Sequence, residues 1–161
     1  MIGWINNRLR KQDEGFTLVE LMVVVLVIAI LIAIAIPTFL GARQRAQDRA
    51  AQSDLRNGLT AAKVHYVDNE DYAATIAQLG AIEPSLTFVA IAAADTDNVG
   101  FVTESVVVGD NQRITMAKQS ASGTFFCISD TATGAGSGTF YMSGAAVAAV
   151  DTAAECNGAS W

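Results

Sequence analysis

The chain has 161 residues, of which 52% are hydrophobic, and a formal net charge of −6. This length allows one modest domain and an appendage. Residues 64–161 contain eleven acids against only Arg113 and Lys118, so this part carries a charge near −9. Such an acidic domain repels the phosphate backbone of nucleic acids, and the composition therefore argues against nucleic-acid binding.

A charged leader and a long apolar run open the chain. The leader, residues 1–15, holds three bases and two acids, and residues 21–42 follow as 22 residues without a charge. As a helix this run is about 33 Å long, enough to cross a hydrocarbon core of about 30 Å. The remaining small domain could not surround a helix that is apolar on every side. The sequence therefore predicts a membrane-spanning segment.

Glu20 stands at the threshold of this run, three residues after Thr17. That spacing is a capping box, which explains an acid in the first turn of a helix. A carboxylate at membrane depth is costly, however, and this cost favours a functional role. If the chain is cut between Gly15 and Phe16, the new α-amine lies four residues before Glu20 on the same helical face, about 6 Å along the axis. The amine can then pair with its own Glu20 or with that of a neighbouring copy.

Ordinary signal-peptide cleavage is an alternative for the N-terminus. Ala33 and Ala35 offer a small-residue site after a basic leader and an apolar core, and cleavage there leaves Ile36 as the first residue. Glu20 lies between leader and core, where an acid hinders this role, and the apolar run continues to Ala42.

The helical pattern continues through residues 43–67 as an amphipathic stem. Its apolar side chains recur at steps of three and four residues: Ala51, Leu55, Leu59, Ala62 and Tyr66. Upstream of this stripe, Pro37 removes a backbone donor and Gly41 loosens the same region, so we expect a bend or local unwinding between them. The basic neck from Arg43 to Arg49 is expected to stay solvated or to face an interface.

Residues 68–161 are expected to form a globular head. A loop with a weak helical turn near residues 76–79 comes first, closed by Pro84. Five segments rich in β-branched and aromatic residues then alternate with turns: residues 86–93, 99–108, 113–119, 124–130 and 139–144. They predict an antiparallel meander of four or five strands covered on one face by the long helix, an α+β fold.

Cys127 and Cys156 are the only cysteines, and both lie in the head. An even pair in a domain joined to a membrane segment suggests a disulfide in an oxidising compartment, with two buried free thiols as the alternative. Asp95 and Asp97 could offer carboxylates to Ca²⁺, but a solvated turn is the simpler interpretation. His65 has no evident catalytic partner, and no nucleophile elbow, phosphate loop or metal-ligand cluster is present, so no cofactor and no enzymatic activity are expected.

The segment GFTLVE, residues 15–20, followed by the apolar run, Pro37 and the basic neck, resembles the N-terminus of type IV prepilins. The resemblance covers about residues 14–66, and residues 66–75 resemble the loop after the helix in pilins and pseudopilins. It implies that prepilin peptidase cuts after Gly15 and methylates Phe16. It also implies that Glu20 pairs with the N-terminal amine of a neighbouring subunit during assembly, in a site that includes Phe16 and Thr17. Cys127 and Cys156 match the disulfide that closes the C-terminal region of major pilins.

The function implied is that of a structural subunit that polymerises into a pilus-like filament. Its partners are then other copies of itself, prepilin peptidase and the assembly machinery in the membrane. Before assembly the subunit lies in the cytoplasmic membrane as a single span with the head outside, and afterwards at the cell surface. Two alternatives remain: a pseudopilin of a secretion system, and a membrane-anchored extracellular binding domain that never polymerises.

Overall fold

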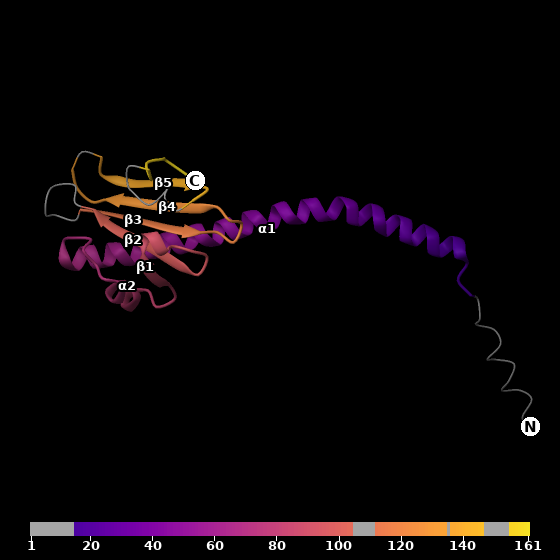
Figure 1. Ribbon diagram of the computed structural model, residues 1–161, viewed down its shortest axis with the longest axis horizontal. Coiled ribbons are helices and arrows are strands. Elements are labelled where there is room, and N and C mark those ends of the chain that lie inside the picture. Colours follow the sequence, from indigo (N-terminus) through magenta and orange to yellow (C-terminus); the bar gives the residue numbers. More distant parts are fainter. Residues whose placement is uncertain (1–14, 105–111, 135, 147–154) are drawn as a thin grey trace, which may run out of the picture. The chain divides into compact units, whose positions relative to one another are not determined.

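A computed structural model describes residues 15–104, 112–134, 136–146 and 155–161 (Figure 1). The chain divides into two compact units, Met1–Ala42 and Arg43–Trp161, and each is taken here by itself. The expected leader lies outside the described residues except for Gly15, and so do parts of the second predicted strand and of the C-terminal tail.

Helix α1, Leu18–Asn69, contributes to both units. In the first unit its apolar side chains are exposed from Leu18 to Leu40, because no described residue of that unit packs on them. Among the described residues, α1 is the helix long and apolar enough to cross a membrane. The sequence's prediction of a long apolar helix here is confirmed.

In the second unit α1 is amphipathic, as its spacing predicts. The buried side of the helix consists of Ala51, Leu55, Gly58, Leu59, Ala61, Ala62 and His65. Tyr66, the last member of the predicted stripe, is half-buried against the same core. The helix ends at Asn69, and Glu70 follows in the left-handed region with φ of 61°.

A second helix, α2, spans Ile76–Ile82, longer than the single turn that the sequence predicts. Its N-terminus is a capping box. The Gln78 backbone N–H donates to Thr75 Oγ1, and the Thr75 backbone N–H donates to Gln78 Oε1 at 2.8 Å. These bonds satisfy donors that a helix start leaves unpaired, which lets a seven-residue helix form.

Five strands form one sheet in chain order (Figure 1). They are β1 (Thr87–Ala90), β2 (Asn98–Glu104), β3 (Arg113–Gln119), β4 (Phe125–Thr131) and β5 (Gly138–Gly144). The pairs from β2 to β5 are antiparallel, as predicted. The prediction is wrong for β1, which runs parallel to β2 with Thr87 opposite Asn98.

The parallel pairing depends on a close approach at Gly100. The chain leaves β1 through a short 3₁₀ helix, η1 (Ile91–Ala93), and folds back over β2. A Cβ on Gly100 would lie 2.7 Å from Ala94 Cβ and 2.8 Å from Ile91 Cα. Only glycine lets the connection lie flat on the strand, a requirement that strand periodicity does not reveal.

The sheet buries both of its faces at β3 and β4. The face toward α1 contributes Ile114, Met116, Phe126 and Ile128 to the main core. On the outer face, Ala94 from the η1 connection and Cys156 from the C-terminal segment cover Ala117 and Cys127. Ala117 and Cys127 have small side chains, and this leaves room on the outer face for the two covering segments. The α+β architecture predicted from the sequence is therefore present.

Candidate assembly site and the head that accompanies it

The start of α1 holds the polar groups that the sequence singled out. The Thr17 backbone N–H donates to Glu20 Oε2 at 2.9 Å, and the Thr17 hydroxyl donates to the same oxygen at 2.7 Å. In return the Glu20 backbone N–H donates to Thr17 Oγ1 at 3.2 Å. The capping box is therefore formed. Both bonds that the Glu20 carboxylate accepts use Oε2, so Oε1 has no partner among the described residues.

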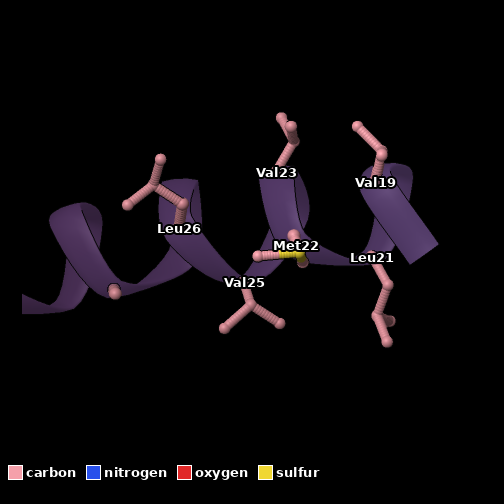
Figure 2. Close-up of a pocket in the computed structure, with 7 residues that line it drawn as sticks. Val19, Leu21, Met22, Val23, Val25 and Leu26 are labelled. Carbon is pink, nitrogen blue, oxygen red and sulfur yellow. The ribbon is translucent and has the colours of Figure 1, made fainter.

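The apolar surface begins beside this carboxylate. Figure 2 shows side chains projecting on opposite sides of the helix, with Val19, Val23 and Leu26 on one side and Leu21 and Val25 on the other. Phe16 is 82% exposed and Leu26 is 60% exposed. A continuous apolar surface of this extent in water is unfavourable, so residues 16–42 require lipid or another apolar partner.

Pro37 lies inside α1, and the helix continues through it to Gly41 and beyond. Proline has no N–H, so the carbonyl four residues earlier loses its helical donor. The polar side chain of Thr38 is satisfied within the helix, because its hydroxyl donates to the Ile34 carbonyl at 3.0 Å. The helix is continuous from Pro37 to Gly41, so the local unwinding that the sequence suggested is not seen, and a bend there stays a prediction.

A buried carboxylate ties α1 to the sheet in the second unit. Asp130, on β4, accepts hydrogen bonds from the hydroxyls of Tyr72 and Thr139, each at 2.6 Å, and lies 2.8 Å from Lys63 Nζ. Burial by itself would raise the pKa of Asp130, but the Lys63, Thr139 and Tyr72 contacts together hold it below its usual value. Burial and the adjacent Asp130 raise the pKa of the Tyr72 phenol. The network is therefore charged and hydrogen-bonded at neutral pH.

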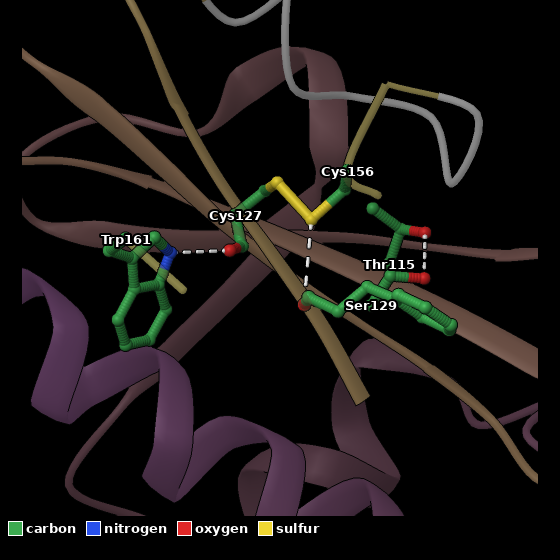
Figure 3. Close-up of a disulfide and its surroundings, with 6 residues drawn as sticks. Thr115, Cys127, Ser129, Cys156 and Trp161 are labelled. Carbon is green, nitrogen blue, oxygen red and sulfur yellow. Dashed lines mark hydrogen bonds between the residues drawn. A yellow bond between two sulfur atoms is a disulfide. The ribbon is translucent and has the colours of Figure 1, made fainter. Parts of the chain in front are cut away.

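A disulfide joins Cys127 to Cys156, with a Cα–Cα distance of 6.0 Å and both side chains fully buried (Figure 3). The expected pairing is therefore present, and the alternative of two free thiols is wrong. The chain then pairs Gly158 with Tyr141 on β5 in an antiparallel bridge. At residue 161 the indole N–H of Trp161 donates to the Cys127 carbonyl at 2.7 Å. One residue of β4 thus anchors the C-terminal segment twice.

Asp95 is engaged within its own turn. One of its carboxylate oxygens, Oδ1, accepts from the backbone N–H groups of Asp97 and Asn98 at 2.8 and 2.7 Å, and both oxygens accept from the Asn98 amide. The bonds from the Asp97 and Asn98 backbones, with that from the Asn98 side chain, lower the pKa of Asp95. Across the part of the chain that the structure describes, no three acidic, histidine or cysteine side chains gather as metal ligands. The turn therefore has a structural explanation without Ca²⁺.

Sequence reasoning missed the Asp130 network and the α2 cap. The cap had a readable signal, because Thr75 and Gln78 have the capping-box spacing. The network had none, since Lys63 and Asp130 are far apart in the chain and each alone looks like a surface charge. His65, for which the sequence showed no evident catalytic partner, is buried, with Nδ1 3.3 Å from the Asp71 carbonyl oxygen.

An exposed apolar helix has Glu20 in a capping box in its first turn, and the chain also has a disulfide-bonded α+β head. These are the features of a pilin-like protein. A family model described as the prokaryotic N-terminal methylation motif matches residues 10–36. By this motif and by the relatives below, part of the chain is similar to type IV pilins.

Three curated relatives are similar to the chain. The type IV wide pilus major component PilA4 of Thermus thermophilus is 39% identical over 41% of this chain and 50% of its own length. The type IV major pilin protein PilA of Myxococcus xanthus is 36% identical over 46% of this chain and 34% of its own length. The type II secretion system core protein G of Dickeya chrysanthemi is 30% identical over 46% of this chain and 48% of its own length. The chain thus matches half or less of each relative, and no solved structure gives a significant match.

Proposed function

We propose that this chain is a structural subunit, not an enzyme, that prepilin peptidase cuts between Gly15 and Phe16 and methylates at Phe16. The processed subunit polymerises through residues 16–42 into a pilus-like filament. The domain boundaries proposed from the sequence follow from this cycle: leader 1–15, filament-core helix 16–42, stem 43–67 and head 68–161. The observation that carries the proposal is the exposed apolar surface of residues 16–42, which has no partner among the described residues of its own unit.

The subunit changes its apolar surroundings during this cycle. Before cleavage, residues 16–42 lie in the cytoplasmic membrane as a single span with the head outside. After cleavage, copies of the same helix replace the lipid. A contact repeated between different surfaces of identical subunits does not close on itself, and so it produces a fibre at the cell surface.

Glu20 provides the register in this proposal. Cleavage gives Phe16 a positively charged amine, and the Glu20 carboxylate of a neighbouring copy is its partner. The unused Oε1 of Glu20 supports this role, because the carboxylate can accept from a second chain without losing its capping bonds.

The Glu20→Gln variant tests this role, because glutamine keeps the capping geometry and removes the charge. We expect surface filaments to be lost while processed subunit still accumulates in the membrane. Glu83→Gln, which removes one carboxylate charge from the head, serves as the control and should assemble normally. Normal filaments from Glu20→Gln would contradict the assigned role and would favour the anchored binding domain that never polymerises.

A secretion pseudopilin is the second candidate, since one relative is a type II secretion system protein. A bound Ca²⁺ in a C-terminal loop without a disulfide would favour it. The Cys127–Cys156 disulfide instead favours the pilus subunit. Filament length separates the two functions, because the pilus subunit is expected to form long surface fibres at its native expression level.

A further inference from the structure

A polar hollow lies beside the C-terminal segment of the second unit. Its volume is about 320 Å³, and its lining is Gln52, Arg56, Tyr141, Ala159, Ser160 and Trp161. Gln52 and Arg56 are one turn apart on α1, and Tyr141 comes from β5. Three elements distant in sequence therefore contribute hydrogen-bonding groups to one place.

Trp161 fixes the position of the Arg56 guanidinium. The guanidinium carbon lies 4.7 Å from the centre of the indole ring, within the range of a cation–π contact. The indole itself is held by its bond to the Cys127 carbonyl and by edge contacts to Phe126 and Tyr141. A flexible arginine is thereby pre-organised before any ligand arrives.

The donors around the hollow have no partner in the part of the chain that the structure describes. Within the described residues, the Arg56 guanidinium, the Gln52 amide and the hydroxyls of Tyr141 and Ser160 form no hydrogen bond and no ion pair. A planar guanidinium with neighbouring hydroxyl and amide donors matches the two oxygens of a carboxylate. The hollow therefore has the chemistry of a carboxylate site.

Two exposed carboxylates at the end of α1 have no cation partner among the described residues. Asp68 and Glu70 at the end of α1 are exposed and make no side-chain bond to any described residue. No basic residue lies in the last turn of α1. The carbonyl end of a helix carries partial negative charge, so two acids there are unfavourable until a cation approaches from outside. This charge complementarity makes a second copy the occupant that the observations favour.

We propose that the Arg56 hollow binds a carboxylate of a second copy of the chain, supplied by Asp68 or Glu70. The inference rests on the proposed filament, in which copies lie side by side. Asp68 is twelve residues beyond Arg56 on α1, which corresponds to about 18 Å along a helix. Two parallel copies joined by this contact are therefore displaced by about that distance along α1.

Charge exchange in the full-length chain, expressed with its assembly machinery, tests the contact. Arg56→Glu and the pair Asp68→Lys with Glu70→Lys should each reduce sheared filament at least about tenfold, because like charges then meet. The three substitutions together should restore filament to within about threefold of the unsubstituted chain. Arg49→Glu is the matched control, since it makes the same charge change two turns earlier on the same face, outside the hollow, and should leave filament yield unchanged.

The amount of processed, disulfide-bonded subunit in the membrane shows whether each variant folds. If the unsubstituted chain forms no filaments, the proposed function fails. If it does, and Arg56→Glu assembles normally or Arg49→Glu is equally damaging, this inference alone is overturned. Loss in both charge-reversed forms without rescue in their combination also overturns the pairing.

Discussion

The two halves of α1 show the same backbone structure under opposite conditions of burial. Leu26, in the first unit, is 60% exposed, whereas Leu55, in the second unit, is fully buried under the sheet. Helix geometry is equal in both places, so the difference lies in the partner. The second half finds its partner within the chain, and the first half finds none among the described residues. Filament assembly is the proposal that supplies the missing partner.

The largest expected difference in head stability is between two leucine truncations, one in each half of α1. Leu55→Ala should lower the free energy of unfolding of the head by about 2–5 kcal/mol, because it leaves a cavity in a packed core. Leu26→Ala should leave head stability unchanged, since its side chain contributes nothing to that core. Denaturant unfolding of both variants in the same detergent is the measurement. Equal losses would show that the two units share one core.

Removing the disulfide should have the next largest effect. Replacing both cysteines by serine should cost the head about 2–4 kcal/mol, because the unfolded chain regains the freedom of the loop between them. The same denaturation curve should result when a reductant is added to the unsubstituted chain during unfolding. A head whose stability is insensitive to both treatments would contradict a structural role for this bond.

The Asp130 network should make the head sensitive to acid. Its pKa is lower in the folded chain than in the unfolded chain, so its contribution is present above the ordinary value of 3.8 and is lost as pH falls below it. Asp130→Asn should cost about 1–3 kcal/mol at pH 7, since Lys63 loses its charged partner. Urea unfolding of both proteins at pH 7 and near pH 2.5 should show this difference shrinking in acid. An equal difference at both pH values would exclude the carboxylate charge as its source.

Two glycines give the smallest and most local comparison. Gly100→Ala should destabilise the head by about 1–3 kcal/mol, because the new methyl group meets Ile91 and Ala94. Gly80→Ala, on α2, meets nothing within 4 Å and should stabilise the helix by up to about 1 kcal/mol. Thermal unfolding of the two variants distinguishes these signs. A neutral Gly100→Ala would show that the η1 connection moves aside freely.

The sequence predicts the parts of the fold that depend on local pattern. The stripe from Ala51 to Ala62 and the β-branched segments place the helix and the antiparallel strands, because burial repeats with the period of each element. The sequence does not predict that β1 runs parallel to β2, because this direction depends on a connection packing onto Gly100. Nor does it predict the ion pair of Asp130 with Lys63, since periodicity cannot identify a charged partner that lies far along the chain.

The candidate site divides in the same way. Gly15, Phe16 and Glu20 lie within six residues of one another, so the sequence alone identifies them as a group. The capping bonds of Glu20 follow from its spacing to Thr17. The Arg56 hollow is assembled from α1, β5 and the C-terminal segment. Only the fold brings these residues together, and no short-range pattern marks them.

Determination of the N-terminal residue of the subunit in purified surface filaments tests the central claim most directly. The account predicts filaments made of this chain beginning at N-methylated Phe16. A first residue of Ile36 would show ordinary signal cleavage, and Met1 would show that no processing occurs. Either result would contradict a filament whose register depends on the amine of Phe16 and the carboxylate of Glu20.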